Sequence, residues 1–187
     1  MARTESTMLA LGTPAPEFRL PDVVSGQMVG LEDFSGKRGL LVMFICRHCP
    51  FVKHVQNELA VVGRDYRDKS LGIVAISSND ADAYPDDAPE SLREMAAELG
   101  FTFPFCFDET QEVARAYDAA CTPDFYLFDD RLQLVYRGQL DDSRPGKDVP
   151  VTGRDLRSAI NALLEGCPIS SNQKPSLGCN IKWRGSQ

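Results

Sequence analysis

The sequence predicts an α/β protein in which helices flank a mixed sheet, in the order βαβ followed by ββα. Two continuous apolar runs, residues 39–45 and 71–77, are separated by a segment of helical periodicity. Two later strand-like runs are joined by only a few residues, which predicts an antiparallel hairpin. A segment of helical periodicity then follows the hairpin.

The first half of the chain reads as a strand, a helix and a second strand. The run "GLLVMFI" at residues 39–45 is continuously apolar, as expected of a strand buried on both faces. Pro50 suits a first helical turn, where its missing N–H is no loss. The run "LGIVAIS" at residues 71–77 predicts a second buried strand. The helix between them has one apolar face, made of Val52, Val55, Leu59, Val62 and Tyr66.

The middle of the chain is more polar. The segment "SNDADAYPDDAPE" at residues 78–90 predicts turns, and we expect its acidic residues to be solvated or to border a partner groove. Gly100 stands where a helix C-cap is expected. The short segment "FTFPFCF" and a short helix near residues 109–117 come next. The helix ending at Gly100 has an apolar face of Leu92, Met95, Ala96 and Leu99.

The last third predicts the hairpin and a final helix. The runs "DFYLFD" at residues 124–129 and "LQLVYRG" at residues 132–138 should pair as antiparallel strands. Thr152 and Asp155 have the spacing of a capping box, and Gly166 suits the end of the helix that follows. The apolar face of this helix consists of Leu156, Ile160, Leu163 and Leu164.

A chain of 187 residues is expected to form a single domain. We expect a core over residues 39–165, an N-terminal extension with strand signals at 10–38, and a tail at 168–187. The apolar groups of "SLGCNIKW" could dock this tail on the body. The apolar run at residues 40–45 is far shorter than the ~20 residues that span a bilayer.

Composition narrows the function classes. A net charge of -7 without a basic stripe argues against nucleic-acid partners. The N-terminus lacks the apolar segment of a secretory signal, so we expect a cytoplasmic protein that does not contact membranes. Six cysteines are too few for a disulfide scaffold, and a reducing compartment keeps most cysteines as thiols. A close pair of cysteines in that setting points to redox chemistry or to a metal.

The motif "CRHC" places Cys46 and Cys49 at the end of the first predicted strand. Thiol–disulfide exchange needs a thiolate, and a helix N-terminus lowers a thiol's pKa. We therefore expect Cys46 to be the nucleophile, with Arg47 and protonated His48 adding positive charge. Cys49, one helical turn away, would then resolve the mixed disulfide.

This order of elements, with CxxC after the first core strand, resembles the thioredoxin fold over residues 39–165. The segments "GTPAPEFRLPD" and "LEDFSGK" resemble the opening of the peroxiredoxin-related alkyl-hydroperoxide-reductase and thiol-specific-antioxidant family. The thioredoxin resemblance implies a cis peptide bond at Thr122-Pro123, opposite the CxxC. It also implies that the backbone there pairs with an extended partner segment as a substrate groove.

The peroxiredoxin resemblance is incomplete at the site. Cys49 and Pro50 match the peroxide-reducing cysteine and the proline that follows it. Cys46 stands where these enzymes have a threonine, Val42 where they have a proline, and Thr122 about where they have an arginine. These departures imply that efficient peroxidase activity is not expected.

The sequence thus predicts a thiol–disulfide oxidoreductase acting on protein or small-molecule disulfides, with an unidentified thiol electron donor and no cofactor or metal. One alternative is a thiol peroxidase in which Cys49 is oxidised and Cys46 condenses with it. Another is a non-enzymatic binding module or zinc site. Its candidate ligands would be Cys46, His48, Cys49 and His54.

The remaining cysteines have weaker signals. We expect Cys106 to pack as a small hydrophobe and Cys121 to be an unreactive loop thiol. Cys179 is a less favoured candidate for an extra resolving thiol, since only neighbouring apolar residues suggest that the tail docks.

Overall fold

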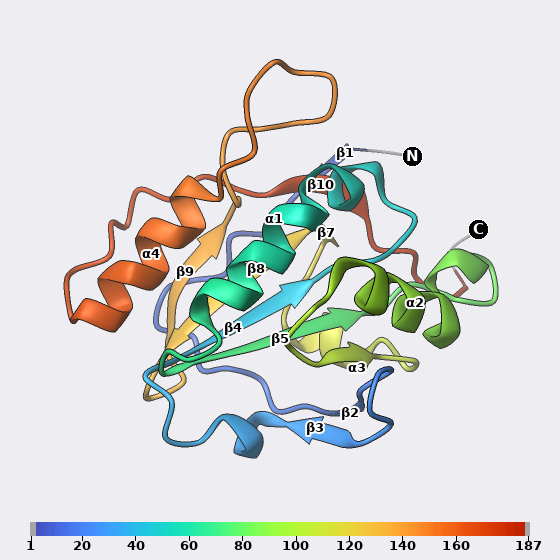
Figure 1. Ribbon diagram of the computed structural model, residues 1–187, viewed down its shortest axis with the longest axis horizontal. Helices are drawn as coiled ribbons and strands as arrows, with labels where there is room; N and C mark the ends of the chain where they lie inside the picture. The colour runs from blue at the N-terminus through green and yellow to red at the C-terminus, as the bar shows by residue number, and fades with distance from the viewer. Residues whose placement is uncertain (1–2, 186–187) are drawn as a thin grey trace.

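The computed structural model describes residues 3–185, and its centre is a five-stranded mixed sheet (Figure 1). The strand order is β6-β5-β4-β8-β9, with β4 parallel to β5 and antiparallel to β8. The strands are β1 (Arg3–Glu5), β2 (Arg19–Pro21), β3 (Met28–Gly30), β4 (Gly39–Phe44), β5 (Leu71–Ser77), β6 (Phe105–Phe107), β7 (Cys121–Thr122), β8 (Asp124–Asp129), β9 (Leu134–Gly138) and β10 (Leu177–Asn180).

Helices cover both faces of this sheet. They are α1 (Pro50–Tyr66), α2 (Pro89–Leu99), α3 (Glu112–Ala116) and α4 (Arg154–Glu165), with short 3-10 turns η1 (Leu31–Phe34) and η2 (Pro85–Asp87). Side chains alternate along β4, so Leu41 and Met43 join the core under α1, α2 and α4. Val42 and Phe44 face the second core, which α3 and the β2–β3 hairpin cover. Both faces of β4 are therefore buried, as its apolar run predicts.

The predicted core elements are confirmed. The strand at residues 71–77 is β5, and the expected apolar face of α1 is buried. Gly100 and Gly166 end α2 and α4 in the left-handed conformation, at φ 64° and 72°. The two late strands form the β8–β9 hairpin. The Thr122-Pro123 bond is cis, as the resemblance implies.

The predicted capping box at Thr152 is wrong. The N-cap of α4 is Gly153, with φ 65°, and it makes no side-chain cap bond. The N–H of Thr152 donates to Asp141 Oδ2 at 2.7 Å, and the Asp155 carboxylate instead accepts from Gln139 and Arg154. Buried Asp141 also accepts the N–H groups of Gly153 and Ser143, while the Thr152 hydroxyl accepts the N–H of Arg154 at 3.3 Å and not that of Asp155.

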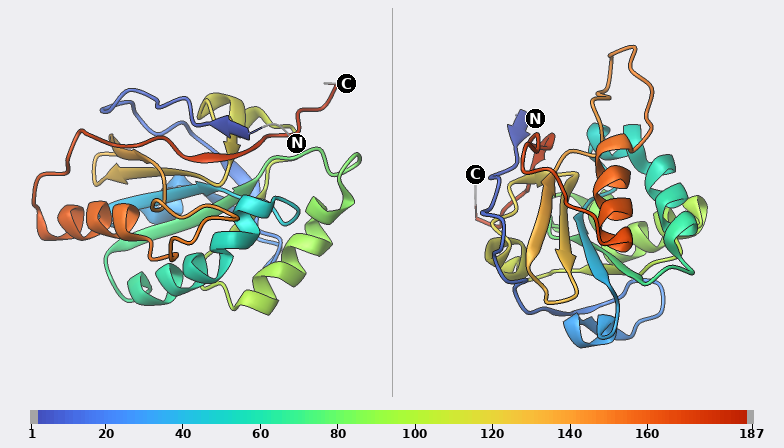
Figure 2. Two further views of the ribbon diagram at one scale, coloured as in Figure 1. Left: turned by 90° about the horizontal axis from the view of Figure 1, so that it is seen from above. Right: turned by 90° about the vertical axis from the view of Figure 1, so that its left-hand side faces the viewer.

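A second sheet joins the two ends of the chain to the site region. Its order is β1-β10-β7, and both strand pairs are antiparallel. Figure 2 shows the N-terminal and C-terminal strands side by side on the same flank of the molecule. The tail therefore docks on the body. Within residues 3–185, no helix combines the length and apolar character needed to cross a membrane.

Candidate functional site

The two cysteines of the CRHC motif lie between the end of β4 and the start of α1. Both side chains are 0% exposed. Thr122 contacts both: its Oγ1 lies 3.3 Å from Cys46 Sγ, and its carbonyl oxygen lies 3.2 Å from Cys49 Sγ. The fold therefore brings the predicted pair, Thr122 and the adjoining cis-proline, Pro123, together in one buried site.

The helix N-terminus belongs to Cys49 and not to Cys46. Because α1 begins at Pro50, Cys49 is its N-cap, and the backbone N–H of Val52 reaches the Cys49 sulfur. A hydrogen bond from Cys46 lowers the pKa of Cys49 to about 5, helped by Cys179 and Val52 and opposed by burial. Burial, the hydrogen bond to Cys49 and the charge of Asp87 raise the pKa of Cys46 well above its ordinary value.

These directions correct the expectation that Cys46 has the lowered pKa. Cys46 precedes the first residue of α1 by four positions, so the helical N–H groups are aimed at Cys49. The hydrogen bond from Cys46 and the N–H groups of α1 therefore favour a thiolate at Cys49 over one at Cys46.

A buried carboxylate, Asp87, holds the loop between the cysteines. Its Oδ1 accepts the backbone N–H groups of Arg47 and His48 at 2.8 and 3.1 Å. Its Oδ2 contacts His48 Nδ1 at 2.5 Å and accepts from Asn79 Nδ2 at 2.8 Å. Burial opposes ionisation, but the bonds from His48 and Asn79 lower the pKa of Asp87. Asp87 therefore fixes the backbone of the motif and places a negative charge near Cys46.

The structure directs the charge of Arg47 away from the sulfurs. Its guanidinium contacts the Ser91 carbonyl at 2.7 Å, Glu94 at 2.8 Å and Glu98 at 3.4 Å, all on α2. His48 lies between Asp87 and Tyr84, whose ring stacks on the imidazole with centroids 5.1 Å apart. These two residues therefore link the motif to η2 and α2, and their role in lowering a cysteine pKa stays a prediction.

The potential metal ligands differ from the predicted set. The grouped side chains are Cys46, His48 and Asp87, and their ligand atoms lie within 4.8 Å of one another. Both oxygens of Asp87 already accept two hydrogen bonds each. The expected ligand His54 lies one turn into α1, facing a small crevice beside Pro123 and Leu177.

The other cysteines separate into two kinds. Cys106 is buried in the second core, and burial raises its pKa to about 12, as expected for a packing residue. Burial also raises the pKa of Cys121, while Cys167 is exposed. Cys179 differs, because it is buried in the same core cluster as Cys46 and Cys49 and its thiol hydrogen-bonds to Cys49.

Two residues of the site were missed or undervalued from sequence. Asp87 belongs to the acidic turn expected to be solvated, where its neighbour Asp86 is indeed exposed. Two adjacent aspartates give no sign of which one is buried. Cys179 had only the apolar character of the tail as its signal. Its place depends on pairing with Thr122, 57 positions earlier, which a single sequence does not reveal.

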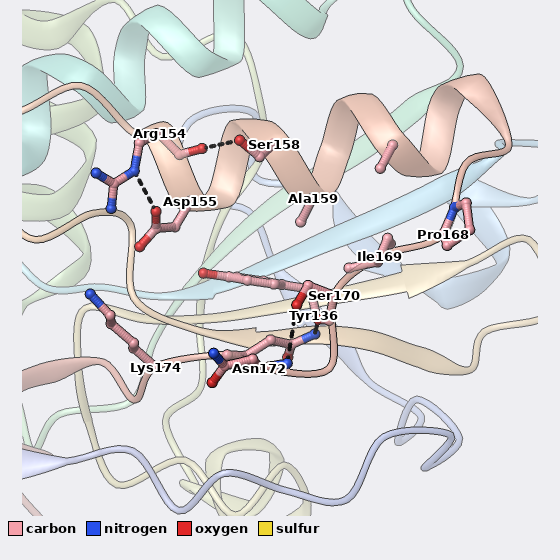
Figure 3. Close-up of a pocket in the computed structure, with 12 residues that line it drawn as sticks. Tyr136, Arg154, Asp155, Ser158, Ala159, Pro168, Ile169, Ser170, Asn172 and Lys174 are labelled. Carbon is pink, nitrogen blue, oxygen red and sulfur yellow. Dashed lines mark hydrogen bonds and ion pairs between the residues drawn. The ribbon is translucent and has the colours of Figure 1, made fainter.

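A cavity of about 320 Å³ lies apart from the cysteines, between α4 and the tail segment at residues 168–174 (Figure 3). Arg154 and Asp155 pair at its edge at 2.8 Å. Its described lining comes from β9, α4 and the tail, and includes neither residue of the dithiol. This cavity is therefore separate from the site formed by Cys46 and Cys49.

Reduced Cys49 should show an unusually low pKa in solution. As the pH is lowered, we expect the thiolate absorbance of the reduced protein to fall with a midpoint near pH 5, since the pKa of Cys49 in the folded protein is about 5. Cys46→Ala should raise this midpoint by removing the largest stabilising hydrogen bond, whereas Cys106→Ala should leave it unchanged. An ultraviolet pH titration measures it. A midpoint unaltered in Cys49→Ser would assign the thiolate to another residue.

Comparison with known proteins places these features in a family. The AhpC/TSA family model matches residues 11–137. The thiol-disulfide oxidoreductase ResA of Geobacillus kaustophilus is 30% identical over 129 residues, 67% of each chain. The crystal structure of an uncharacterized conserved protein from Geobacillus kaustophilus is 57% identical, with a TM-score of 0.97 over 100% of this chain and 99% of that one.

The fold has a wider set of relatives. The thioredoxin domain of a thiol-disulfide oxidoreductase from Bacteroides vulgatus superimposes with a TM-score of 0.65 at 23% identity, over 83% of this chain and 99% of that one. This likeness concerns the fold alone and confirms the predicted thioredoxin architecture. Since the family model matches well over half of the sequence, including the CRHC motif, Asp87 and Thr122, the chain belongs to the AhpC/TSA family.

Proposed function

We propose that this protein is a thiol–disulfide oxidoreductase whose reactive pair is Cys46 and Cys49. One observation carries the proposal: the two sulfurs meet on Thr122, and one of them is stabilised as a thiolate by the other. The similarity to a thiol-disulfide oxidoreductase supports the same reaction class. The substrates would be disulfide-bearing proteins or small molecules, and a thiol donor would regenerate the dithiol.

The lowered pKa of Cys49 suggests the order of steps. The Cys49 thiolate attacks one sulfur of the partner disulfide, and the first partner thiolate leaves. The Cys46 thiol then loses its proton and attacks Cys49 Sγ, which forms the Cys46–Cys49 disulfide and releases the second partner thiol. The partner gains two electrons and takes up two protons, one from the Cys46 thiol and one from the solvent, while the Cys49 thiolate and Cys46 are oxidised to the disulfide. This order reverses the roles expected from the sequence.

A thiol peroxidase is the second candidate. The AhpC/TSA match and a thiolate at Cys49, followed by Pro50, favour it. The peroxide oxygen would oxidise Cys49 to a sulfenic acid, and Cys46 would condense with it to give water and a disulfide. However, Cys46 and Thr122 stand where the resemblance would require a threonine and an arginine to activate peroxide. Thiol–disulfide exchange therefore remains the favoured function. The cytoplasmic location expected from the sequence stays a prediction.

Trapping of the first covalent adduct tests the order of attack. We expect Cys46→Ser, mixed with a disulfide-bonded protein and quenched rapidly with acid, to form a mixed disulfide through Cys49. Cys49→Ser should form none at a comparable rate, because the pKa of Cys46 is raised. Mass spectrometry of the quenched samples identifies the linked cysteine. Rapid adduct formation only in Cys49→Ser would restore Cys46 as the nucleophile.

A further inference from the structure

The C-terminal tail occupies the edge that the resemblance assigns to a substrate. Strand β10 pairs antiparallel with β7, with Cys179 opposite Thr122 and Asn180 opposite Cys121. The contact is close, since a Cβ on Gly178 would lie 2.0 Å from the Thr122 carbonyl oxygen. The expectation of a groove open at Thr122 is therefore corrected: the chain's own strand fills this edge. The strand brings a cysteine with it.

The cysteine of this strand lies against the dithiol. Cys179 is 3% exposed and shares a core cluster with Cys46 and Cys49. The Cys179 thiol hydrogen-bonds to the Cys49 sulfur, and the Thr122 carbonyl oxygen lies 3.2 Å from the same sulfur. Cys49 therefore has two thiol neighbours: Cys46 from the CRHC loop and Cys179 from β10.

We propose that Cys179 is a third redox residue that resolves mixed disulfides on Cys49 by forming a Cys49–Cys179 disulfide. This inference rests on the proposed exchange function. After the Cys49 thiolate has attacked a partner disulfide, the departing partner thiolate takes the proton of Cys179. The Cys179 thiolate attacks Cys49 Sγ, the Cys49–Cys179 bond forms, and the bond to the partner breaks. The Cys49 thiolate and the Cys179 thiol are oxidised to the disulfide, and the partner disulfide is reduced to one thiol and one thiolate, which takes a proton from the solvent.

The electrostatics of the site give this step an order. Burial, and then the hydrogen bond and negative charge of Cys49, raise the pKa of Cys179 to about 12. Cys179 thus stays protonated while Cys49 is a thiolate. Once Cys49 has become part of a mixed disulfide, its charge is gone, so Cys179 ionises more readily. Formation of the mixed disulfide on Cys49 therefore also makes Cys179 easier to deprotonate, so that it can attack Cys49 Sγ.

Through Cys179, the oxidation state of the cysteines would determine whether β10 is covalently attached to α1. A Cys49–Cys179 disulfide would join α1 covalently to β10, which is paired with both β7 and β1. A Cys46–Cys49 disulfide would leave Cys179 reduced and β10 held by backbone hydrogen bonds and packing. The third thiol can convert one form into the other by attacking Cys49 Sγ, with Cys46 leaving as the thiolate and no net oxidation.

The lifetime of the Cys49 adduct tests the proposal. Reduced Cys46→Ser, Cys46→Ser/Cys179→Ser and Cys46→Ser/Cys121→Ser are mixed with the same disulfide-bonded protein and quenched over time. We expect a transient adduct and then a Cys49–Cys179 disulfide in the first and third variants. In the variant without Cys179 the adduct should persist at least tenfold longer. Cys121 is the matched control, being a buried cysteine on the adjoining strand.

The outcomes separate this inference from the proposed function. Equal adduct lifetimes with and without Cys179 would overturn the role of Cys179 while keeping Cys49 as the nucleophile. A complete lack of adduct on Cys49 in correctly folded variants would overturn the order of attack and this proposal with it. The wild-type protein can be tested in the same way after oxidation by a limiting amount of partner disulfide. Peptide mapping should find two populations of molecules, one with a Cys46–Cys49 disulfide and one with a Cys49–Cys179 disulfide. A Cys46–Cys49 disulfide alone would contradict the proposal.

Discussion

Replacing Cys49 with serine is expected to lower the turnover of a protein disulfide by at least about 10³-fold, as loss of an activated nucleophile does. Serine has no ionised sulfur at neutral pH, and Cys46 cannot take over because its pKa is raised by burial and by Asp87. Steady-state reduction of a protein disulfide, with a thiol reductant in excess, measures the loss.

Two further cysteine variants serve as comparisons for Cys49→Ser. Cys106→Ala removes a buried thiol from the second core and should leave turnover close to that of the wild type. Cys46→Ser should retain part of the turnover if Cys179 resolves the adduct. Equal activity in Cys49→Ser and the wild type would remove Cys49 from the mechanism.

Asp87→Ala is expected to destabilise the fold by roughly 3–5 kcal/mol, the range found when one partner of a buried charged interaction is removed. The substitution leaves the backbone N–H groups of Arg47 and His48 and the Asn79 amide without their acceptor. It also removes the negative charge that raises the pKa of Cys46, so that pKa should fall. Denaturant unfolding and a thiolate titration measure the two effects.

Asp87→Asn and Asp141→Ala are the controls for this prediction. Asparagine keeps the shape but not the charge, so it should lower the pKa of Cys46 at a smaller cost in stability. Asp141→Ala also removes a buried acceptor of three N–H groups, but at the start of α4, and should leave the thiol titration unchanged. If Asp87→Ala and Asp141→Ala altered the thiol titration equally, the change in the pKa of Cys46 would come from general destabilisation of the fold and not from loss of the Asp87 charge.

The stability effect of Asp87 should depend on pH. The pKa of Asp87 is lowered on folding, so its contribution is present above the unfolded pKa of about 3.9 and is lost as pH falls through the folded pKa. The difference in unfolding free energy between wild type and Asp87→Asn should therefore shrink towards acid pH. A difference independent of pH would mean that ionisation of Asp87 adds nothing to stability.

Local patterns predicted the core of the fold well. The continuous runs of β4 and β5, the apolar face of α1 and the glycines that end α2 and α4 each depend on residues within a few positions of one another. The CxxC motif likewise marked Cys46 and Cys49. These features follow from periodicity, capping and spacing, which a single sequence contains.

The features missed depend on distant pairing. Asp87 binds a loop 39 to 40 positions earlier, and β10 reaches β7 from the far end of the chain. The order of the thiol pKa values was misjudged because it depends on which residue caps α1 and on where Asp87 and Cys179 lie. The capping box predicted at Thr152 is absent because Asp141 accepts the Thr152 N–H from another loop and the Asp155 N–H donates to the Leu140 carbonyl.

A single-turnover competition tests most directly whether the pair exchanges disulfides. Reduced protein is mixed either with a disulfide-bonded protein or with hydrogen peroxide, and the loss of the Cys49 thiol is followed by rapid quench. If the pair exchanges disulfides, we expect fast reaction with the disulfide-bonded protein, and reaction with peroxide no faster than that of an ordinary thiolate. Fast peroxide consumption with slow disulfide reduction would contradict it and would make Cys49 a peroxidatic cysteine.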